Sequence, residues 1–344
     1  MPENIERLSE VGPLDPRTGY PLWYEDSTGV RLELVWEPGD DNAPVAIDPE
    51  ESGPLRDIPL FPGESFYFSA ETDLPIGGGE DDGEARVILA LEATFGGNEE
   101  IRDGQQIVFG RIRFRIKDGR PETTYMLTHP YGTAEVTTDD DGDGTVTQDI
   151  GVTPLGFEDA LAGQIAPFLR WTPFQDAPEG YIGDGTTRHT VTGSPFSTNF
   201  ALVEGTGAGT AGGDPDPQDP GNRDKVHTDE FVVQGRLAGT LGAEVTRAVY
   251  RRTAAGDVTV DVFARTAPGQ QLLVTAPGLP DTPMEGGEST NYIARLAGAD
   301  LPQEVTVTNR TDVPPWSTTV PVTDVVEITR AEYAVAAQTL TVTA

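Results

Sequence analysis

The chain has 344 residues, a formal net charge of −34 and no cysteine. A surface this acidic repels nucleic acid and anionic membranes, so we expect neither a nucleic-acid partner nor membrane insertion. The lack of cysteine excludes disulfides, thiolate metal sites and a catalytic thiol. The 40 glycines and 29 prolines favour many short strands joined by turns, which predicts an all-β protein.

The N-terminal part of the chain is predicted to be a tail followed by one large β domain. Residues 1–19 are polar and rich in proline, and we expect a tail or strap there. Residues 20–204 are predicted to form a jelly-roll-like β-sandwich, because apolar and polar residues alternate along short segments. The predicted strands are 31–36, 64–70, 86–95, 106–116, 123–128, 132–137, 188–192 and 199–203. Residues 157–169 have helical spacing instead, which predicts a short amphipathic helix packed on a sheet.

A linker and a second domain are predicted to follow. Residues 205–222 are rich in Gly, Asp and Pro, a composition typical of a flexible or extended linker. Residues 223–324 are predicted to form a C-terminal immunoglobulin-like β-sandwich without the disulfide of antibody domains. Its predicted strands are 230–237, 245–251, 257–264, 270–275, 291–296 and 303–308.

Residues 325–344 repeat the opening of the second domain, which indicates a tandem array. The pattern Thr-Arg-Ala-x-Tyr begins at Thr246 and again at Thr329, 83 positions later. An alternating strand follows both copies, and a period of this size fits one β-sandwich module. We expect residues 325–344 to form the first hairpin of a further module, which either continues in the natural protein or is completed by another chain. Unpaired strand edges accept added strands, so the second alternative predicts head-to-tail filaments.

The strongest motif for a binding site is the acidic loop at residues 139–149. Its candidate calcium ligands are Asp139, Asp141, Asp143, Thr145 and Asp149. Carboxylates at alternate residues followed by Gly144 match the start of a calcium loop, and Ca²⁺ prefers such hard oxygen ligands. The end of the loop differs, because Ile150 occupies the position of the usual terminal carboxylate. Calcium binding is one prediction for this loop, and a solvated hairpin tip is the other.

Histidines provide a second candidate metal site in the first domain. His129 and His189, with Asp184 nearby in sequence, would form a metal-binding group if the fold brought them together. The alternative is that each histidine is a hydrogen-bonded structural residue at a strand end. No nucleophile motif or phosphate-binding loop appears in a strand–helix context, which argues against an enzyme.

Aromatic residues provide a candidate surface for a carbohydrate. Five large aromatic residues of the first domain would suit a sugar-binding platform: Trp23, Tyr24, Trp36, Trp171 and Tyr181. The alternative is that they fill the core of the sandwich, where aromatic side chains bury large areas. The exposure of these side chains therefore separates a glycan-binding module from a structural domain.

Several segments within residues 15–235 resemble an uncharacterised group of large secreted bacterial proteins. The segments that carry the resemblance are 18–24, 108–113, 129–132, 167–171 and 191–200. The resemblance implies an N-terminal β domain followed by tandem immunoglobulin-like modules in an extracellular protein. It implies no catalytic residues, because no activity is known for the group.

These features predict a non-enzymatic extracellular or cell-surface protein with a structural or adhesive role. Its expected partners are further copies of itself, joined through the C-terminal strands into filaments, and surface glycans. One alternative is a carbohydrate-binding module of a secreted multidomain protein, which an exposed aromatic platform would favour. The other is a secreted hydrolase with its site in the first domain, which a pocket containing both histidines and convergent carboxylates would favour.

Overall fold

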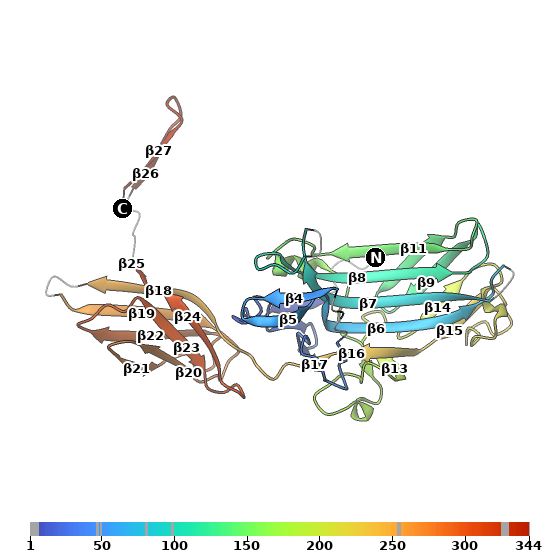
Figure 1. The fold of residues 1–344 in the computed structure, drawn as a ribbon, viewed down its shortest axis with the longest axis horizontal. Coiled ribbons are helices and arrows are strands. Elements are labelled where there is room, and N and C mark those ends of the chain that lie inside the picture. Colours follow the sequence, from blue (N-terminus) through green and yellow to red (C-terminus); the bar gives the residue numbers. More distant parts are fainter. Residues whose placement is uncertain are drawn as a thin grey trace. The chain divides into compact units, whose positions relative to one another are not determined.

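The computed structural model confirms the predicted all-β class (Figure 1). It divides into two compact units, Met1–Ala238 and Gly239–Ala344, which we call unit 1 and unit 2. Strand pairs in both units are antiparallel except for one parallel pair in unit 2, and the helical elements are short 3₁₀ turns. The structure describes residues 7–45, 48, 50–79, 82–97, 100–252, 256–324 and 330–343.

A seven-stranded sheet dominates unit 1, and its strands run side by side in the order β11-β8-β7-β6-β16-β13-β12 (Figure 1). The sequence predicts strands at the positions of β6, β7, β8 and β13, and β8 alternates between buried and more exposed residues along its second half. The strands are β6 (Ser65–Ile76), β7 (Gly83–Phe95), β8 (Gln106–Lys117), β11 (Gly144–Ile150), β12 (Arg170–Trp171), β13 (Arg188–Thr192) and β16 (Glu230–Gln234).

Two four-stranded sheets and a hairpin complete the described part of unit 1. One sheet has the order β10-β9-β14-β15, and the other has the order β1-β2-β3-β17. Their strands are β9 (Thr124–His129), β10 (Gly132–Thr137), β14 (Ala201–Glu204), β15 (Lys225–Thr228), β1 (Leu8–Val11), β2 (Trp23–Asp26), β3 (Arg31–Glu33) and β17 (Arg236–Leu237). The hairpin consists of β4 (Ser52–Leu55) and β5 (Ile58–Pro62).

One hydrophobic core joins all the sheets of unit 1. Ile112, Phe114 and Ile116 of β8 are buried in this core, whereas Arg113 and Arg115 between them lie on the opposite face. Since side chains alternate along a strand, the seven-stranded sheet has a core face and an outer face. We call the side of the sheet that carries these arginines the outer face.

The predicted helix at 157–169 is wrong in type and length. The structure has a 3₁₀ turn, η1 (Phe157–Ala162), which is followed by Gly163. Phe168 lies in an irregular segment outside any helix or strand and is buried in the core. Gly163 and Pro167 explain the difference, because glycine and proline both terminate helices. The apolar residues of this segment still pack inward, but not on one helical face.

The structure also corrects the predicted linker at 205–222, which packs within unit 1. The Gly77 N–H donates to Ala208 O at 3.0 Å, and the His227 N–H donates to Asp214 O at 2.8 Å. The side chain of Asp216 is buried. Residues 223–238 follow as three strands of unit 1, so the boundary lies after Ala238. The glycines and aspartates that resemble a linker serve tight turns, in which aspartate oxygens accept backbone N–H groups.

The predicted strap at 1–19 is part of unit 1 as far as it is described. Residues 1–6 lie outside the described residues. Strand β1 pairs antiparallel with β2, and the Gly12 N–H donates to Trp23 O at 2.8 Å. Thr18 is buried, and a hydrogen bond from Gln106 Nε2 to Thr18 O fixes the segment against β8.

Unit 2 contains two four-stranded sheets, with the orders β22-β19-β18-β25 and β21-β20-β23-β24. Apolar side chains from both sheets are buried, among them Val260, Val262, Val274, Val305 and Val307. This two-sheet arrangement is the sandwich predicted for the second domain, with a later start than expected. The strands are β18 (Glu244–Arg252), β19 (Val258–Arg265), β20 (Leu272–Ala276), β21 (Leu279–Pro283), β22 (Asn291–Gly298), β23 (Glu304–Asn309), β24 (Trp316–Pro321) and β25 (Thr323–Asp324).

The repeated C-terminal segment forms a separate two-stranded sheet, β26 (Arg330–Ala334) and β27 (Thr339–Thr343). The start of the repeat, residues 325–329, lies outside the described residues, as does Ala344. The predicted hairpin is therefore present over its described residues.

Candidate functional site

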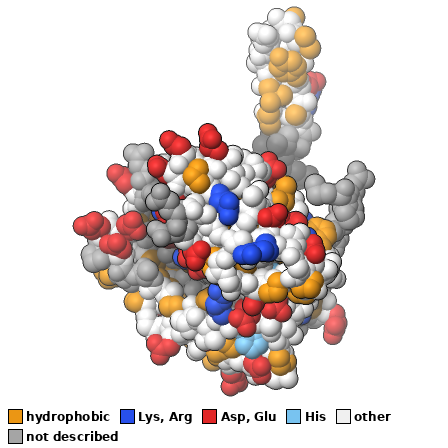
Figure 2. Space-filling view, turned by 90° about the vertical axis from the view of Figure 1, so that its right-hand side faces the viewer, with side chains coloured by type: hydrophobic (Ala, Val, Ile, Leu, Met, Phe, Trp, Pro, Cys, Tyr) orange, Lys and Arg blue, Asp and Glu red, His pale blue; other side chains and the backbone are white. Residues whose placement is uncertain are grey.

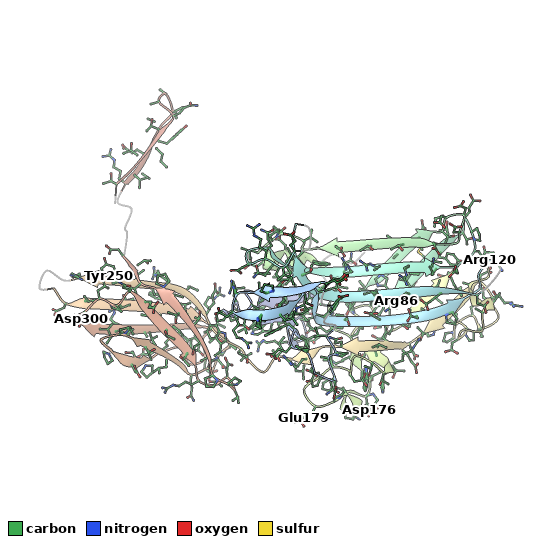
Figure 3. The ribbon with its side chains drawn as sticks, in the orientation of Figure 1. Arg86, Arg120, Asp176, Glu179, Tyr250 and Asp300 are labelled. Atoms are coloured by element: carbon green, nitrogen blue, oxygen red, sulfur yellow. The ribbon has the colours of Figure 1, made fainter. Side chains whose placement is uncertain are left out.

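A polar pocket lies on the outer face of the seven-stranded sheet. Strand periodicity places Ser69, Glu71 and Asp73 of β6 on this face. The register of the sheet brings side chains from neighbouring strands beside them. Asp73 pairs with Arg86 of β7, and Ser69 pairs with Gln234 of β16. Figure 3 shows the side chain of Arg86 over this sheet. The pocket is therefore built by register across strands that are distant in sequence.

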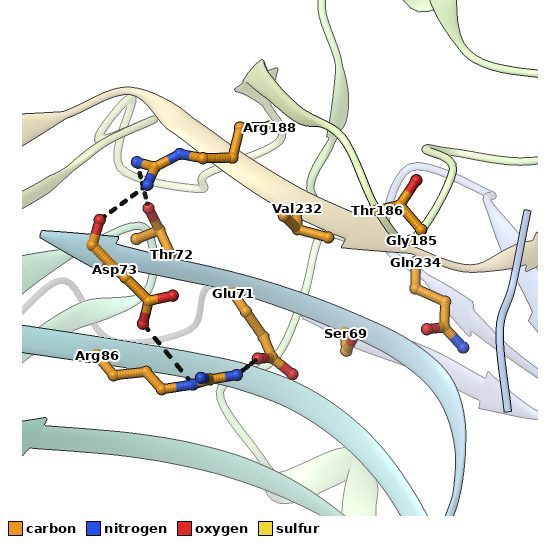
Figure 4. A pocket seen from close by; sticks show the side chains of 10 residues that line it. All are labelled: Ser69, Glu71, Thr72, Asp73, Arg86, Gly185, Thr186, Arg188, Val232 and Gln234. Atoms are coloured by element: carbon orange, nitrogen blue, oxygen red, sulfur yellow. Dashed lines mark hydrogen bonds and ion pairs between the residues drawn. The ribbon is translucent and has the colours of Figure 1, made fainter. Parts of the chain in front are cut away.

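The pocket has a volume of about 300 Å³, and polar groups form most of its wall (Figure 4). Its lining residues are Ser69, Glu71, Thr72, Asp73, Arg86, Gly185, Thr186, Arg188, Val232 and Gln234. They come from β6, β7, β13, β16 and the loop before β13. Val232 supplies the one aliphatic side chain among them, so the pocket can bind a ligand mainly through hydrogen bonds.

Two arginines of the pocket have different surroundings. Arg86 donates to Glu71 Oε2 at 2.6 Å, and its Nε lies 3.8 Å from Asp73 Oδ1. The hydrogen bond with Glu71 raises the pKa of Arg86. Arg188 donates to neutral acceptors, with Asp73 O at 2.9 Å and Thr72 Oγ1 at 3.0 Å. The guanidinium of Arg188 is thus held in place without a carboxylate partner in these bonds.

Two buried polar atoms of the pocket have no hydrogen-bond partner within the described protein. They are Nε2 of Gln234 and Oδ1 of Asp73. Gln234 as a whole is only 8% exposed. Buried polar atoms are almost always paired in folded proteins, because an unmade bond leaves their desolvation uncompensated. The ion pair between Asp73 Oδ1 and Arg86 Nε, at 3.8 Å, is longer than a hydrogen bond. The hydrogen bonds that Gln234 Nε2 and Asp73 Oδ1 do not make indicate that a further molecule completes them.

The sequence does not reveal this pocket directly. Its detectable signal is Ser69, Glu71 and Asp73 at alternate positions of an otherwise apolar strand. Gln234 belongs to a segment that the sequence assigns to the second domain, whereas the structure pairs it with β6 in unit 1. This long-range pairing creates the pocket, and no local pattern specifies it.

A second cluster of charges on the outer face joins β7, β8 and β11. Arg111 donates to Glu92 Oε2 at 2.9 Å and to both carboxylate oxygens of Asp149, at 2.9 and 3.0 Å. Burial, and next a hydrogen bond with Glu64, raise the pKa of Glu92 far above the usual range of a carboxyl. The ion pair with Arg111 opposes this rise, but Asp149 shares the same guanidinium.

The candidate calcium ligands do not converge in the structure. Asp139 Oδ1 accepts the N–H groups of Asp141 and Asp143 at 3.0 and 2.9 Å. Asp143 forms an ion pair with Lys117, which lowers the pKa of Asp143. The two remaining candidates lie on β11, where Thr145 pairs with Arg115 and Asp149 pairs with Arg111 of β8. Within the described ranges, no three His, Asp or Glu side chains form a group suited to a metal ion.

The histidines lie on different sheets, and each has its own packing. His129 of β9 is 1% exposed, and burial lowers its pKa to about 4. Its Nδ1 accepts the Tyr131 N–H at 3.3 Å. His189 of β13 stacks on Trp171 at a centroid distance of 4.5 Å, and its Nε2 lies 3.5 Å from Asp176. The histidine metal pair predicted as one alternative is therefore not assembled.

The candidate aromatic platform is mostly core. Trp23, Tyr24 and Trp171 are at most 6% exposed. Trp36 stacks on Phe61 at a centroid distance of 5.3 Å. Tyr181 is half-buried, and its hydroxyl donates to Asp40 at 2.8 Å. The core interpretation is thus confirmed for the three buried residues, and the five do not form a single exposed surface.

The visible face in Figure 2 shows acidic side chains spread widely among fewer basic ones, as the net charge of −34 requires. Among the described residues, no helix is long and apolar enough to cross a membrane.

No protein-family model matches the chain, and no curated protein matches it. Among solved structures, it is similar to that of the surface layer protein SbsC, domains 1–6, with 14% sequence identity and a TM-score of 0.18. The alignment covers 97% of this chain and 41% of that chain, so this chain spans less than half of its length. A TM-score this low carries no argument about fold or function.

Proposed function

We propose that this chain is a non-enzymatic structural protein of an extracellular or cell-surface assembly, and that the β26–β27 hairpin joins copies of it by strand exchange. The observation that carries the proposal is a shared strand register. The hairpin repeats the pairing of β18 with β19 in unit 2. The matching pairs are Arg247↔Phe263 with Arg330↔Thr343, Ala248↔Val262 with Ala331↔Val342, and Tyr250↔Val260 with Tyr333↔Leu340.

The two hairpins differ in what covers their equivalent faces. In unit 2, Val260 and Val262 of β19 are both 0% exposed, because the second sheet of the sandwich packs over them. At the equivalent positions of the C-terminal hairpin, Leu340 is 61% and Val342 is 49% exposed. Tyr333 on the same face is 58% exposed. Figure 2 shows hydrophobic side chains along this hairpin at the top of the view. Leaving such a face in water forgoes the main driving force for folding.

A second copy of the chain carries a surface that fits this face. The sheet β21-β20-β23-β24 already packs against β18 and β19, with Val274, Val305 and Val307 buried at the contact layer. A hairpin with the same register and similar side chains can replace β18–β19 of another copy on that sheet. Such an exchange uses different surfaces on donor and acceptor, so it is heterologous and extends into open filaments.

The test is the mass of the chain in solution as a function of concentration. We expect light scattering to show a mass that rises with concentration for the full chain, and a monomer after deletion of residues 330–343. Tyr333→Arg should have the same effect as the deletion, because a guanidinium cannot be buried unpaired in the exchanged sandwich. Val313→Arg is the matched control, since Val313 is an apolar residue of unit 2 that is 84% exposed outside the hairpin. A full chain that stays monomeric at high concentration would contradict the proposal.

A further inference from the structure

We infer that the polar pocket of unit 1 binds one neutral sugar residue of a glycan. This inference does not depend on the self-assembly proposed for unit 2, because all the residues involved belong to unit 1. A volume of about 300 Å³ is at the small end of the range for ligand pockets, and it accommodates a single monosaccharide unit. The wall of the pocket is polar, as a ligand covered with hydroxyl groups requires.

The unpaired atoms of the pocket match the chemistry of a sugar hydroxyl. Gln234 Nε2 needs an acceptor, and Asp73 Oδ1 needs a donor. A hydroxyl group supplies both, because it has one O–H to donate and two lone pairs that accept. Gln234 pairs with Ser69, four positions along β6 from Asp73, so the two atoms lie at opposite ends of the pocket. A hydroxyl of the bound sugar can satisfy the Gln234 amide, and a hydroxyl of the adjoining sugar residue of the glycan can satisfy Asp73. Figure 4 shows both side chains in the wall of the pocket, on β16 and β6.

The charges of the pocket favour a neutral ligand over an ion. Glu71 and Asp73 balance Arg86 and Arg188, and Arg86 is already paired with Glu71 at 2.6 Å. An anion would meet two carboxylates, and a cation would meet two guanidinium groups, so either would encounter like charge at close range. A neutral hydroxylated ligand avoids this repulsion. It can still accept from Arg188, which three neutral oxygens hold in a fixed orientation.

The expected affinity is modest. No aromatic side chain lines the pocket, and the large aromatic residues Trp23, Tyr24 and Trp171 are buried elsewhere. The ligand therefore gains hydrogen bonds in exchange for those it makes with water, with little apolar area buried. We expect a dissociation constant on the order of 1 mM for one sugar residue. Several chains in one assembly would bind a polymeric glycan more tightly through avidity.

The experiment is saturation-transfer NMR on the full chain with single sugars and two charged probes. The neutral probes are methyl glucoside, methyl galactoside, methyl mannoside and N-acetylglucosamine, and the charged probes are the anion glucuronate and the zwitterion glycine. We expect at least one neutral sugar to bind, with its affinity reduced at least tenfold in Gln234→Leu. Thr186→Trp, at an exposed position of the pocket wall, should block binding without disturbing the core. It also keeps the test informative if Gln234→Leu does not fold.

Arg113→Gln is the matched control for these variants. Arg113 lies on the outer face of β8, outside the pocket wall, and donates to Thr147 Oγ1 at 3.3 Å. The Arg113→Gln variant should bind the sugar with the same affinity as the unaltered chain. Three results would overturn the inference: no neutral sugar binds, only glucuronate or glycine binds, or Thr186→Trp leaves sugar binding unchanged. Since none of these measurements depends on mass, failure here is distinct from failure of the assembly proposal.

Discussion

Asp26 is expected to hold two distant parts of unit 1 together. Its side chain is 0% exposed at the end of β2. Oδ1 accepts the N–H groups of Thr28 at 2.8 Å and Val30 at 3.1 Å, within the turn to β3. Oδ2 accepts the buried N–H of Phe168 at 2.9 Å, 142 residues away in sequence. One carboxylate thus orders a turn and attaches the segment after Gly163 to it.

The magnitude follows from these bonds. A buried N–H left without an acceptor costs roughly 2 kcal/mol, and each bond within the turn contributes about 1 kcal/mol because water can replace it in part. Because Oδ1 also accepts the Thr28 hydroxyl at 2.7 Å, Asp26→Ala should lower the unfolding free energy of unit 1 by about 5 kcal/mol. Asp26→Asn should cost about 2 kcal/mol, since its oxygen can serve the turn while its NH₂ faces the Phe168 N–H. The assay is urea unfolding followed by tryptophan fluorescence.

Asp48→Ala is the matched control for this series. Asp48 also accepts a backbone N–H, from Glu50 at 2.8 Å, but it is exposed. Its replacement should change the unfolding free energy by less than about 0.5 kcal/mol. The reasoning is refuted if Asp26→Ala costs less than about 1 kcal/mol, because the buried bond to Phe168 alone should exceed that value. An Asp26→Asn variant as stable as the original would likewise remove the role assigned to Phe168.

Three further predictions concern pH, calcium and proteolysis. Burial raises the pKa of Glu92, so the folded state keeps a proton that the unfolded chain loses above about pH 4.3. The unfolding free energy should therefore fall as the pH rises above about 4.3, and it should level off once the pH exceeds the raised pKa of Glu92. Glu92→Gln should flatten this dependence in pH-dependent urea melts, and Glu135→Gln, at an exposed carboxylate of β10, should leave it unchanged. If the 139–149 loop binds Ca²⁺, the melting temperature should be higher with Ca²⁺ than with a chelator. Asp141→Ala should abolish this difference. Equal melting temperatures with Ca²⁺ and with chelator would exclude calcium as a ligand of the loop. Limited proteolysis should spare residues 205–222, since this segment is hydrogen-bonded within unit 1, and early cleavage there would contradict the packing described.

Strands are the part of the fold that the sequence predicts well. The predicted strands at 132–137 and 188–192 coincide with β10 and β13, and the prediction at 106–116 is one residue shorter than β8. The segments 106–116 and 132–137 alternate in polarity, so local pattern and burial agree there. The sequence does not predict which strands become neighbours, because register and sheet order depend on packing between distant segments.

The wrong domain boundary has a specific physical cause. The composition of residues 205–222 is that of a flexible linker, but aspartate oxygens in and near the segment accept backbone N–H groups. Asp216 accepts the Gln218 N–H at 2.9 Å, and Asp224 accepts the Gly207 N–H at 2.6 Å. Glycine and aspartate are as suited to tight turns as to linkers, so composition alone cannot distinguish the two. The wrong boundary also placed Gln234 in the second domain, away from β6, with which it pairs. The sequence prediction therefore missed the pocket.

Salt should separate the two proposed activities, because they rest on different forces. Copies of a chain with a net charge of −34 repel each other, and this repulsion weakens as salt shortens the screening length from about 30 Å at 0.01 M to about 8 Å at 0.15 M. Exchange of the β26–β27 hairpin relies on apolar contacts between the hairpin and the acceptor sheet, which salt does not weaken, so the mass of the full chain should increase with ionic strength. Binding of a neutral sugar involves no net charge, and its affinity should stay constant over the same range. Light scattering and saturation-transfer NMR across one salt series measure both. If the assembly dissociates as the ionic strength increases, ion pairs join the copies, and the apolar side chains of Tyr333, Leu340 and Val342 do not.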